Sequence, residues 1–305
     1  MLPRGRKLNR MAHAGSGIIY VAFGYEYVLM ALHSARSAIT NNSTLKCALV
    51  TNSHIEEIKQ IKNVFCFVEE VESANEHNRH IKTNISSYSP FEKTLFLDCD
   101  TEVNGDLTPM FDCLDRFDLI AKLNSEPTLK TYDIAPQIPS HAFPTWNTGA
   151  IFFRSGEQTN RLFAEWGRIF REMKGERDQP AFARTIYENP DIKLLSVNCL
   201  WNTDPADLRL LLGKKTRSKS IIWHYREPSK FLPAARAIYE LHCEISKDYC
   251  KNNDPLEVHY VDRRYKMMLK PWYALNKVRR LFSRKRSDKV LKRPRMTGLT
   301  FHPEK

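Results

Sequence analysis

The chain has 305 residues, of which 42% are hydrophobic, and it carries a net charge of +12. This length and hydrophobicity suit one large α/β domain with an appendage, or two small domains, and they exclude a wholly disordered chain. No apolar run approaches the ~20 residues that cross a bilayer, and no long apolar stretch follows the basic N-terminus, which argues against a membrane span and a secretory signal.

The first hundred residues alternate between apolar, β-branched runs and segments of helical periodicity. Strands are predicted at 17–23, 45–50, 63–68 and 93–97, and helices at 25–39 and 55–61. This alternation is typical of a mostly parallel sheet covered by helices, which binds ligands at the carboxyl ends of its strands. Phe23-Gly24 and Asp98-Cys99-Asp100 both lie at such ends.

The rest of the chain continues the α/β pattern and then changes composition. Strands are predicted at 117–123, 150–153 and 221–223, and helices at 158–173, 179–187 and 232–246. The segment 124–146, rich in Pro, Ser and Thr, has the length of a loop that covers a substrate. The predicted organisation is a basic tail (1–16), a main domain (17–253) and a basic C-terminal extension (254–305).

The cysteines indicate a reducing, cytoplasmic setting. Their number, seven, is odd, and no C-x-x-C pair occurs. This argues against a disulfide scaffold and against a zinc ribbon.

Asp98 and Asp100 form a D-x-D motif at the end of a predicted buried strand. Alternate side chains of a strand point the same way, so these carboxylates can converge on one hard cation such as Mg²⁺ or Mn²⁺. Such a cation can bridge a diphosphate and help a nucleotide leave. The alternative is that both residues start a turn and cap a helix near Leu107, because a bare D-x-D motif is common.

The residues around this motif resemble glycosyltransferase family 8 and glycogenin-like proteins. The similarity includes Lys82-Thr83 and the segment Ser89–Leu107, and it continues in the family's order at 146–153, 177–179, 198–202 and 223–225. Together these segments cover roughly residues 17–230. The resemblance implies a GT-A fold, which is α/β with a Rossmann-like, mostly parallel sheet flanked by helices. It also implies a metal-dependent, hexosyltransferase-like enzyme.

The resemblance further implies the substrates, the cofactor and the residues that hold them. The donor would be a nucleotide-sugar, in this family a UDP-sugar, and the cofactor Mn²⁺ or Mg²⁺. Transfer to a glycan, a lipid-linked or a protein acceptor would retain the anomeric configuration. The implied metal ligands are Asp98, Asp100 and His224; the implied catalytic residues are Asn147, Asp178 and Gln179; and the implied donor-binding residues are Ala22, Phe23, Tyr27, Lys82, Asp98, Asp100 and Lys230.

Each of these assignments has a purely structural alternative. His224, Phe23 and Tyr27 could be core residues, Asn147 a turn former, Asp178 a helix cap, and Lys82 and Lys230 exposed lysines. The sequence also departs from the family after His224, where the expected glycine is missing. Arg226 is therefore an alternative to Lys230 as the contact for a diphosphate.

The positive charge is concentrated near the C-terminus. Fourteen Lys and Arg and two Asp lie from Asp262 to Arg295, a difference of +12 that equals the net charge of the whole chain. Trp272, Leu275, Val278, Leu281 and Phe282 recur among them at helical spacing, which predicts a basic amphipathic helix. Such a helix suits an anionic membrane surface, so the predicted location is the cytoplasm with peripheral attachment to a membrane. The alternatives are a flexible solvated tail and, less favoured, binding of nucleic acid.

A non-enzymatic function is the main alternative to a transferase. An inactive GT-A scaffold that binds a nucleotide or a sugar would show the same fold. The complete set of Asp98, Asp100 and His224 favours the enzyme.

Overall fold

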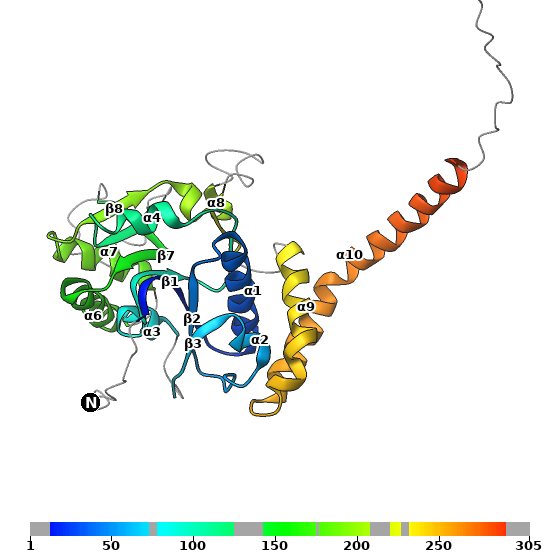
Figure 1. The fold of residues 1–305 in the computed structure, drawn as a ribbon, viewed down its shortest axis with the longest axis horizontal. Helices are drawn as coiled ribbons and strands as arrows, with labels where there is room; N and C mark the ends of the chain where they lie inside the picture. The colour runs from blue at the N-terminus through cyan, green and yellow to red at the C-terminus, as the bar shows by residue number, and fades with distance from the viewer. Residues whose placement is uncertain are drawn as a thin grey trace, which may run out of the picture.

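The computed structural model describes residues 13–72, 78–124, 143–174, 177–207, 220–226 and 232–290. Within them, a seven-stranded sheet has the strand order β3-β2-β1-β4-β7-β6-β8 (Figure 1). Its strands are β1 (His13–Ala22), β2 (Lys46–Thr51), β3 (Phe65–Glu70), β4 (Phe91–Leu97), β6 (Leu119–Leu123), β7 (Trp146–Arg154) and β8 (Leu194–Val197). A separate two-stranded sheet pairs β5 (Thr101–Val103) with β9 (Ile222–His224).

The large sheet is mostly parallel, as the sequence predicted. The pairs β1–β2, β2–β3, β1–β4 and β6–β8 are parallel, whereas β7 runs antiparallel to both β4 and β6. Leu97 at the end of β4 therefore pairs with Ala150 in the middle of β7, and the Asp98 backbone N–H donates to the Gly149 carbonyl at 2.8 Å. This reversal places the beginning of β7 beside the D-x-D motif.

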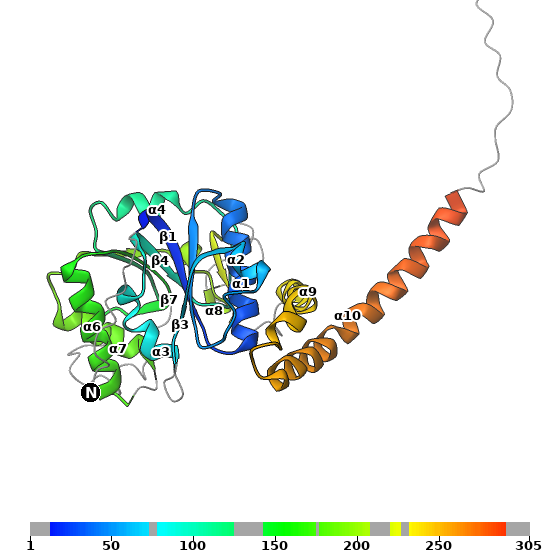
Figure 2. The same cartoon turned by 60° about the horizontal axis from the view of Figure 1, so that its bottom comes forward.

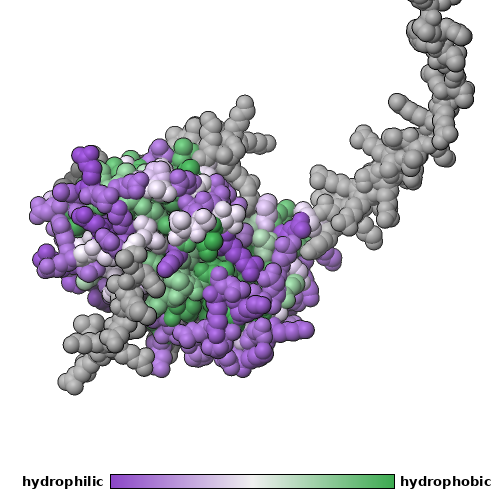
Figure 3. All heavy atoms as spheres, viewed as in Figure 1, coloured by the Kyte–Doolittle hydropathy of each residue, from purple (hydrophilic) through white to green (hydrophobic). Residues whose placement is uncertain are grey.

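Helices cover both faces of the sheet (Figures 1 and 2). They are α1 (Tyr25–Asn41), α2 (Lys59–Lys62), α3 (Asn78–Lys82), α4 (Thr108–Cys113), α6 (Glu157–Glu172), α7 (Asp178–Glu188), α8 (Pro205–Asp207), α9 (Leu232–Tyr249) and α10 (Pro255–Val290). Because side chains alternate along a strand, Ile18 and Tyr20 of β1 join the core layer under α1, α9 and α10, whereas Ile19 and Val21 join the layer under α3, α6 and α7. In the view of Figure 3, hydrophobic residues show at the middle of the face and hydrophilic residues surround them.

The structure differs from the predicted elements in a few places. The helix expected at 55–61 is only α2, because Ile55 and Ile58 are buried by a turn in which the Ile55 N–H donates to the Glu70 carboxylate at 3.0 Å. Strand β1 already begins at His13, inside the predicted N-terminal tail. Helix α7 begins at Asp178, one residue before the predicted start. Residues 125–142 of the predicted covering loop lie outside the described residues.

The predicted boundary at residue 253 falls in the turn between α9 and α10. Val261, Tyr265 and Leu269 on the first part of α10 are buried in the same core layer as α1 and α9. The rest of α10 projects away from the body (Figures 1 and 2), and its side chains from Leu275 on lie outside the description, as does the apolar face predicted there. No helix in the described parts of the chain is both long and apolar enough to cross a membrane.

Candidate active site

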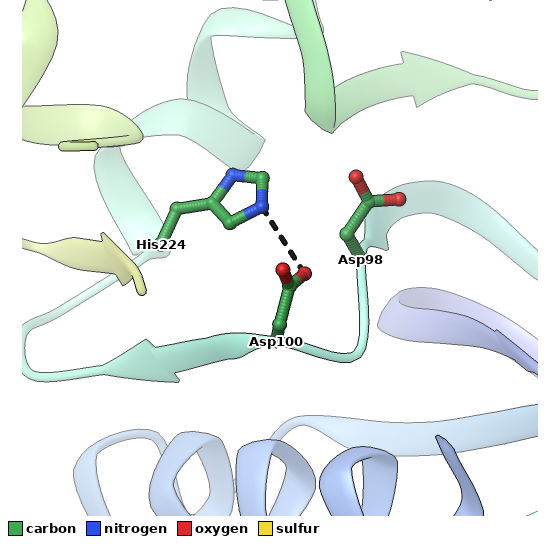
Figure 4. Close-up of side chains that lie close together, drawn as sticks. All are labelled: Asp98, Asp100 and His224. Atoms are coloured by element: carbon green, nitrogen blue, oxygen red, sulfur yellow. Dashed lines mark ion pairs between the residues drawn. The ribbon is translucent and has the colours of Figure 1, made fainter. Parts of the chain in front are cut away.

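The small sheet joins His224 to the D-x-D motif. Strand β5 follows Asp100 directly and pairs antiparallel with β9, which places Thr101 opposite His224. The Tyr225 N–H donates to the Asp100 carbonyl at 3.0 Å and continues this pairing. As Figure 4 shows, the side chains of Asp98, Asp100 and His224 then converge, and one ligand atom of each lies within 4.8 Å of the others.

A chain of hydrogen bonds fixes the orientation of the His224 ring. The Gly149 N–H donates to Asn147 Oδ1 at 2.8 Å, and Asn202 Nδ2 donates to the same oxygen at 3.0 Å. The Asn202 amide must therefore present Oδ1 to His224 Nδ1, which lies 3.2 Å away and acts as the donor. His224 Nε2 is left facing Asp100 at 3.1 Å. A histidine that donates through one nitrogen and offers the other to a cation is the usual arrangement of a metal ligand.

Gly149 leaves the space in which the side chains of His224 and Asp98 approach each other. A Cβ at this position would lie 2.5 Å from His224 Cε1, 2.8 Å from its Nδ1 and 2.9 Å from Asp98 Oδ2. Such distances are far inside van der Waals contact. The glycine of the Asn-Thr-Gly segment thus has a steric function that its neighbours in β7 do not share.

Charges within the cluster are tightly linked. Burial raises the pKa of Asp98, against the opposing effect of Lys82 and His224. Burial also disfavours the charge on Asp100, but the adjacent His224 outweighs it and lowers the Asp100 pKa. Burial likewise opposes an imidazolium, yet Asp100 and Asp98 raise the pKa of His224. Two carboxylates and one imidazole fit Mn²⁺ or Mg²⁺ by chemistry and by position, since a cation would replace the proton between His224 and Asp100.

Lys82 ties the D-x-D motif to the predicted sugar-facing residues. Its buried ammonium lies 3.0 Å from Asp98 Oδ1 and 2.9 Å from Asp178 Oδ2. The Thr148 hydroxyl donates to Asp178 Oδ2 at 2.6 Å. Burial opposes the charge on Asp178, but Lys82, Thr148 and Arg79 lower its pKa to about 2. Asp178 is not the helix cap that the sequence alternative proposed, because the N-cap of α7 is Arg177 and the Asp178 carboxylate forms part of the charged cluster.

These residues line a cavity of about 410 Å³. Of the predicted donor and catalytic residues, it brings together Tyr27, Lys82, Asp98, Asp100, Asp178 and Gln179. Arg226 also lines the cavity, and its Nη2 forms an ion pair with Asp204 Oδ2 at 2.9 Å. The same Asp204 oxygen lies 3.6 Å from Nζ of the buried Lys122. Arg226 has a φ of 62°, so the backbone turns sharply just after the β9 histidine.

Several predicted site residues lie elsewhere. Ala22 and Phe23 belong to the two core layers on opposite faces of the sheet and do not line the cavity. Asn147 is 3% exposed, and its side-chain oxygen accepts from Gly149 and Asn202, so it supports His224 instead of reaching the cavity. Lys230 lies outside the described residues.

The cavity also contains residues that the sequence analysis did not select. They are Val21, Glu26, Met30, Asn78, Arg79, Phe96, Thr148 and Arg264. The signal for Glu26 was its position one residue before Tyr27, after the first strand, and the signal for Thr148 was its place between Asn147 and Gly149. Arg264 carried no such signal, because it is one of many basic residues in the C-terminal segment.

Comparison with known proteins agrees with this geometry. The model of the family described as "Glycosyl transferase family 8" matches residues 18–231. Among curated proteins no match was found. Solved structures with a similar fold include the galactosyltransferase LgtC in complex with donor and acceptor sugar analogues, with a TM-score of 0.53 at 15% identity over 74% of this chain and 94% of that chain.

Two glycosyltransferase structures of greater length are similar as well. The bifunctional glycosyltransferase WbbM has a TM-score of 0.57 at 13% identity over 84% of this chain and 53% of its own. GlyE of Streptococcus pneumoniae TIGR4 has a TM-score of 0.54 at 14% identity over 87% of this chain and 64% of its own. These likenesses show the GT-A fold.

Fold and family match together define a GT-A enzyme that takes its sugar from a nucleotide-sugar donor. The chain belongs to glycosyl transferase family 8. It is therefore a glycosyltransferase, and the alternative of an inactive binding scaffold is set aside.

Proposed function

We propose that this enzyme transfers a sugar from a UDP-sugar and that Asp98, Asp100 and His224 hold Mn²⁺ or Mg²⁺ at the donor diphosphate. The observation that carries the proposal is the convergence of these three side chains, two of which, His224 and Asp98, occupy the space that Gly149 leaves. Tyr27, 47% exposed and lining the same cavity after β1, offers an aromatic ring for the uracil.

The charges around the cavity support a cation-bound diphosphate. Four acidic and four basic side chains line it: Glu26, Asp98, Asp100 and Asp178, and Arg79, Lys82, Arg226 and Arg264. A diphosphate alone would leave a surplus of negative charge among these balanced groups. A bound divalent cation would supply the missing positive charge and act as a Lewis acid on the phosphate oxygens. Arg226, the predicted alternative to Lys230, lines the cavity and pairs with Asp204. In the proposal, Arg226 contacts the diphosphate.

The proposal includes retention of configuration, which the resemblance to the family implies, and the carboxylates around the cavity bear on how retention would occur. Glu26 pairs with Arg264, Asp98 with Lys82, Asp100 with His224, and Asp178 with Lys82 and Thr148. A carboxylate so engaged is a poor nucleophile, which disfavours a covalent glycosyl-enzyme intermediate; for a transfer with retention, this leaves attack by the acceptor on the face that the nucleotide leaves. NMR of the product reports the anomer, and an inverted linkage would contradict this mechanism.

Calorimetric titration of UDP tests the donor site. We expect binding in the presence of Mn²⁺ and no measurable binding with EDTA. Asp100→Asn should weaken binding by at least about 100-fold, because it removes a ligand and its charge together. Asp112→Asn, an exposed aspartate on α4, is the matched control and should bind as the wild type does. Binding that survives both EDTA and Asp100→Asn would remove the metal from the proposal.

The C-terminal segment supports an anionic membrane as a further partner of the proposed enzyme. Ten of the fourteen Lys and Arg in residues 262–295 follow Trp272, and seven of these ten are on the part of α10 that projects from the body. Each basic residue near an anionic surface contributes ~1 kcal/mol. A chain ending at Trp272 keeps the buried Val261, Tyr265 and Leu269, unlike one that ends at the predicted domain boundary.

Co-sedimentation with liposomes containing phosphatidylserine distinguishes the membrane from a solvated tail. The full chain should pellet with anionic liposomes at low salt, and the chain ending at Trp272 should stay in the supernatant. Neutral phosphatidylcholine liposomes serve as the control. Equal partitioning of the two chains would refute membrane attachment through this segment.

A further inference from the structure

Helix α10, the second helix beyond the family region, contributes a side chain to the donor cavity. The family match ends at residue 231, yet Arg264 on α10 lines the cavity together with Tyr27, Asp98 and Asp100. Its side chain is 31% exposed, so it is in contact with the space in which the donor would lie. The cavity is thus completed by a residue that lies more than 30 positions beyond the region the family shares.

Glu26 positions the Arg264 guanidinium. Arg264 Nη1 lies 2.7 Å from Glu26 Oε2, and the Tyr265 hydroxyl donates to Glu26 Oε1 at 3.1 Å. Glu26 is on the first turn of α1, next to Tyr27. Neighbouring residues of α10 therefore hold both oxygens of one carboxylate at the nucleoside side of the cavity, and the ion pair fixes the guanidinium there.

The first part of α10 is anchored firmly enough to present this arginine in a defined place. Glu257 Oε2 accepts from the Tyr25 N–H at 3.1 Å and from the Tyr249 hydroxyl at 2.7 Å, which joins the starts of α1 and α10 to the end of α9. Tyr265 and Leu269 are fully buried in the core layer. The helix is thus anchored on both sides of Arg264, by the hydrogen bonds of Glu257 before it and by the burial of Tyr265 and Leu269 after it.

A guanidinium at this place suits an anionic nucleotide. It carries five N–H donors in a planar fork, so it can hold Glu26 through one edge and donate to phosphate or ribose oxygens through another. Tyr27 lines the same cavity, and burial raises the pKa of its hydroxyl while the charge of Arg264 opposes this, so the arginine acts on the predicted uracil contact. Neighbouring Arg263, by contrast, is exposed.

We propose that Arg264 is a donor-binding residue, supplied by the C-terminal helix, that contacts the nucleotide part of the nucleotide-sugar. This inference rests on the proposed donor site and extends it beyond the region shared by the family. It assigns the first part of α10 to the active site and only the projecting part to other partners.

The test compares nucleotide binding by full-length variants. Arg264→Gln should raise the Kd for UDP with Mn²⁺ by about tenfold, because a charge-assisted contact is lost. Arg263→Gln, the matched control, should leave the Kd unchanged. Thermal melting establishes that each variant is folded. Arg264→Lys keeps the ion pair with Glu26, and it should still raise the Kd, at least about threefold, because a lysine lacks the planar fork.

The outcomes separate this inference from the donor proposal. If the wild type binds UDP with Mn²⁺ and both Arg264 variants bind as tightly as Arg263→Gln, the role of Arg264 is refuted while the donor site stands. If the wild type binds GDP, CDP or ADP instead of UDP, the uridine assignment fails, and the same comparison with that nucleotide decides the role of Arg264.

Discussion

Replacing Gly149 with alanine should reduce the Mn²⁺-dependent affinity for UDP by more than about 100-fold. The new methyl group would lie 2.5 Å from the His224 ring and 2.9 Å from an Asp98 oxygen, so at least one metal ligand must move. Metal coordination depends on ligand positions to a few tenths of an ångström, and a displaced ligand costs much of the affinity. Calorimetric titration of Mn²⁺, and then of UDP, into the variant measures the effect.

Gly156→Ala is the control for this substitution. Gly156 precedes α6, its φ of 174° is extended backbone that any residue adopts, and an added Cβ meets no atom within 4 Å. This variant should bind Mn²⁺ and UDP as the wild type does. If Gly149→Ala did so too, the ligands would not have to meet in the space beside Gly149, and the proposed metal position would be wrong.

Replacing Lys82 with methionine should destabilise the fold by about 3–5 kcal/mol at neutral pH. The substitution removes the ammonium shared by Asp98 and Asp178 and leaves two buried carboxylates without their counter-charge. Urea denaturation measures the change in the free energy of unfolding. Lys62→Met is the control, because Lys62 pairs with Glu57 on the surface and should contribute less than about 1 kcal/mol.

The pH dependence of this effect has a definite sign. The pKa of Asp178 is about 2 in the folded protein, below the ordinary value of about 4 expected in the unfolded chain, so its ionised form stabilises the fold above that value. This contribution is lost as the pH falls from about 4 through about 2. The difference in the free energy of unfolding between the wild type and Lys82→Met should therefore decrease as the pH falls through that range. If this difference is small at neutral pH, or if it increases on acidification, Lys82 does not stabilise the fold through its ion pairs with Asp98 and Asp178.

The local sequence was sufficient for six of the seven strands of the large sheet, but no strand was predicted at β8 (Leu194–Val197). Apolar β-branched runs predicted the strands, and most lie within a few residues of the observed bounds, because burial on both faces of a parallel strand leaves little choice of residue type. The helix predicted at 55–61 was wrong over most of its length, because a local pattern of buried residues does not distinguish a helix from a turn. Three isoleucines at three-residue spacing fit a helix, but turns bury Ile55 and Ile58 equally well, and Glu70 from another strand accepts the Ile55 N–H.

Residues that gather at the cavity could be predicted where a motif gives both the residue type and its position in the chain. Asp98, Asp100, His224, Lys82, Asp178 and Gln179 were chosen from segments that resemble a family, and the structure brings them together. Asn147 was chosen in the same way, but it supports His224 through Asn202. This role depends on hydrogen bonds that join β7, the segment of Asn202 and β9. Ala22 and Phe23 show that a position next to a site does not decide which way a side chain faces.

The sequence by itself thus determined the fold class, the family and the identity of the D-x-D motif, because each depends on the order of residues along the chain. Only the tertiary structure decided which atoms share the cavity. The pairing of β5 with β9 brings His224 to Asp100 across more than 120 residues, and the packing of α10 on α1 brings Arg264 to Glu26 across more than 230. Contacts at such separations arise from packing of the whole chain, and no local pattern of residue types encodes them.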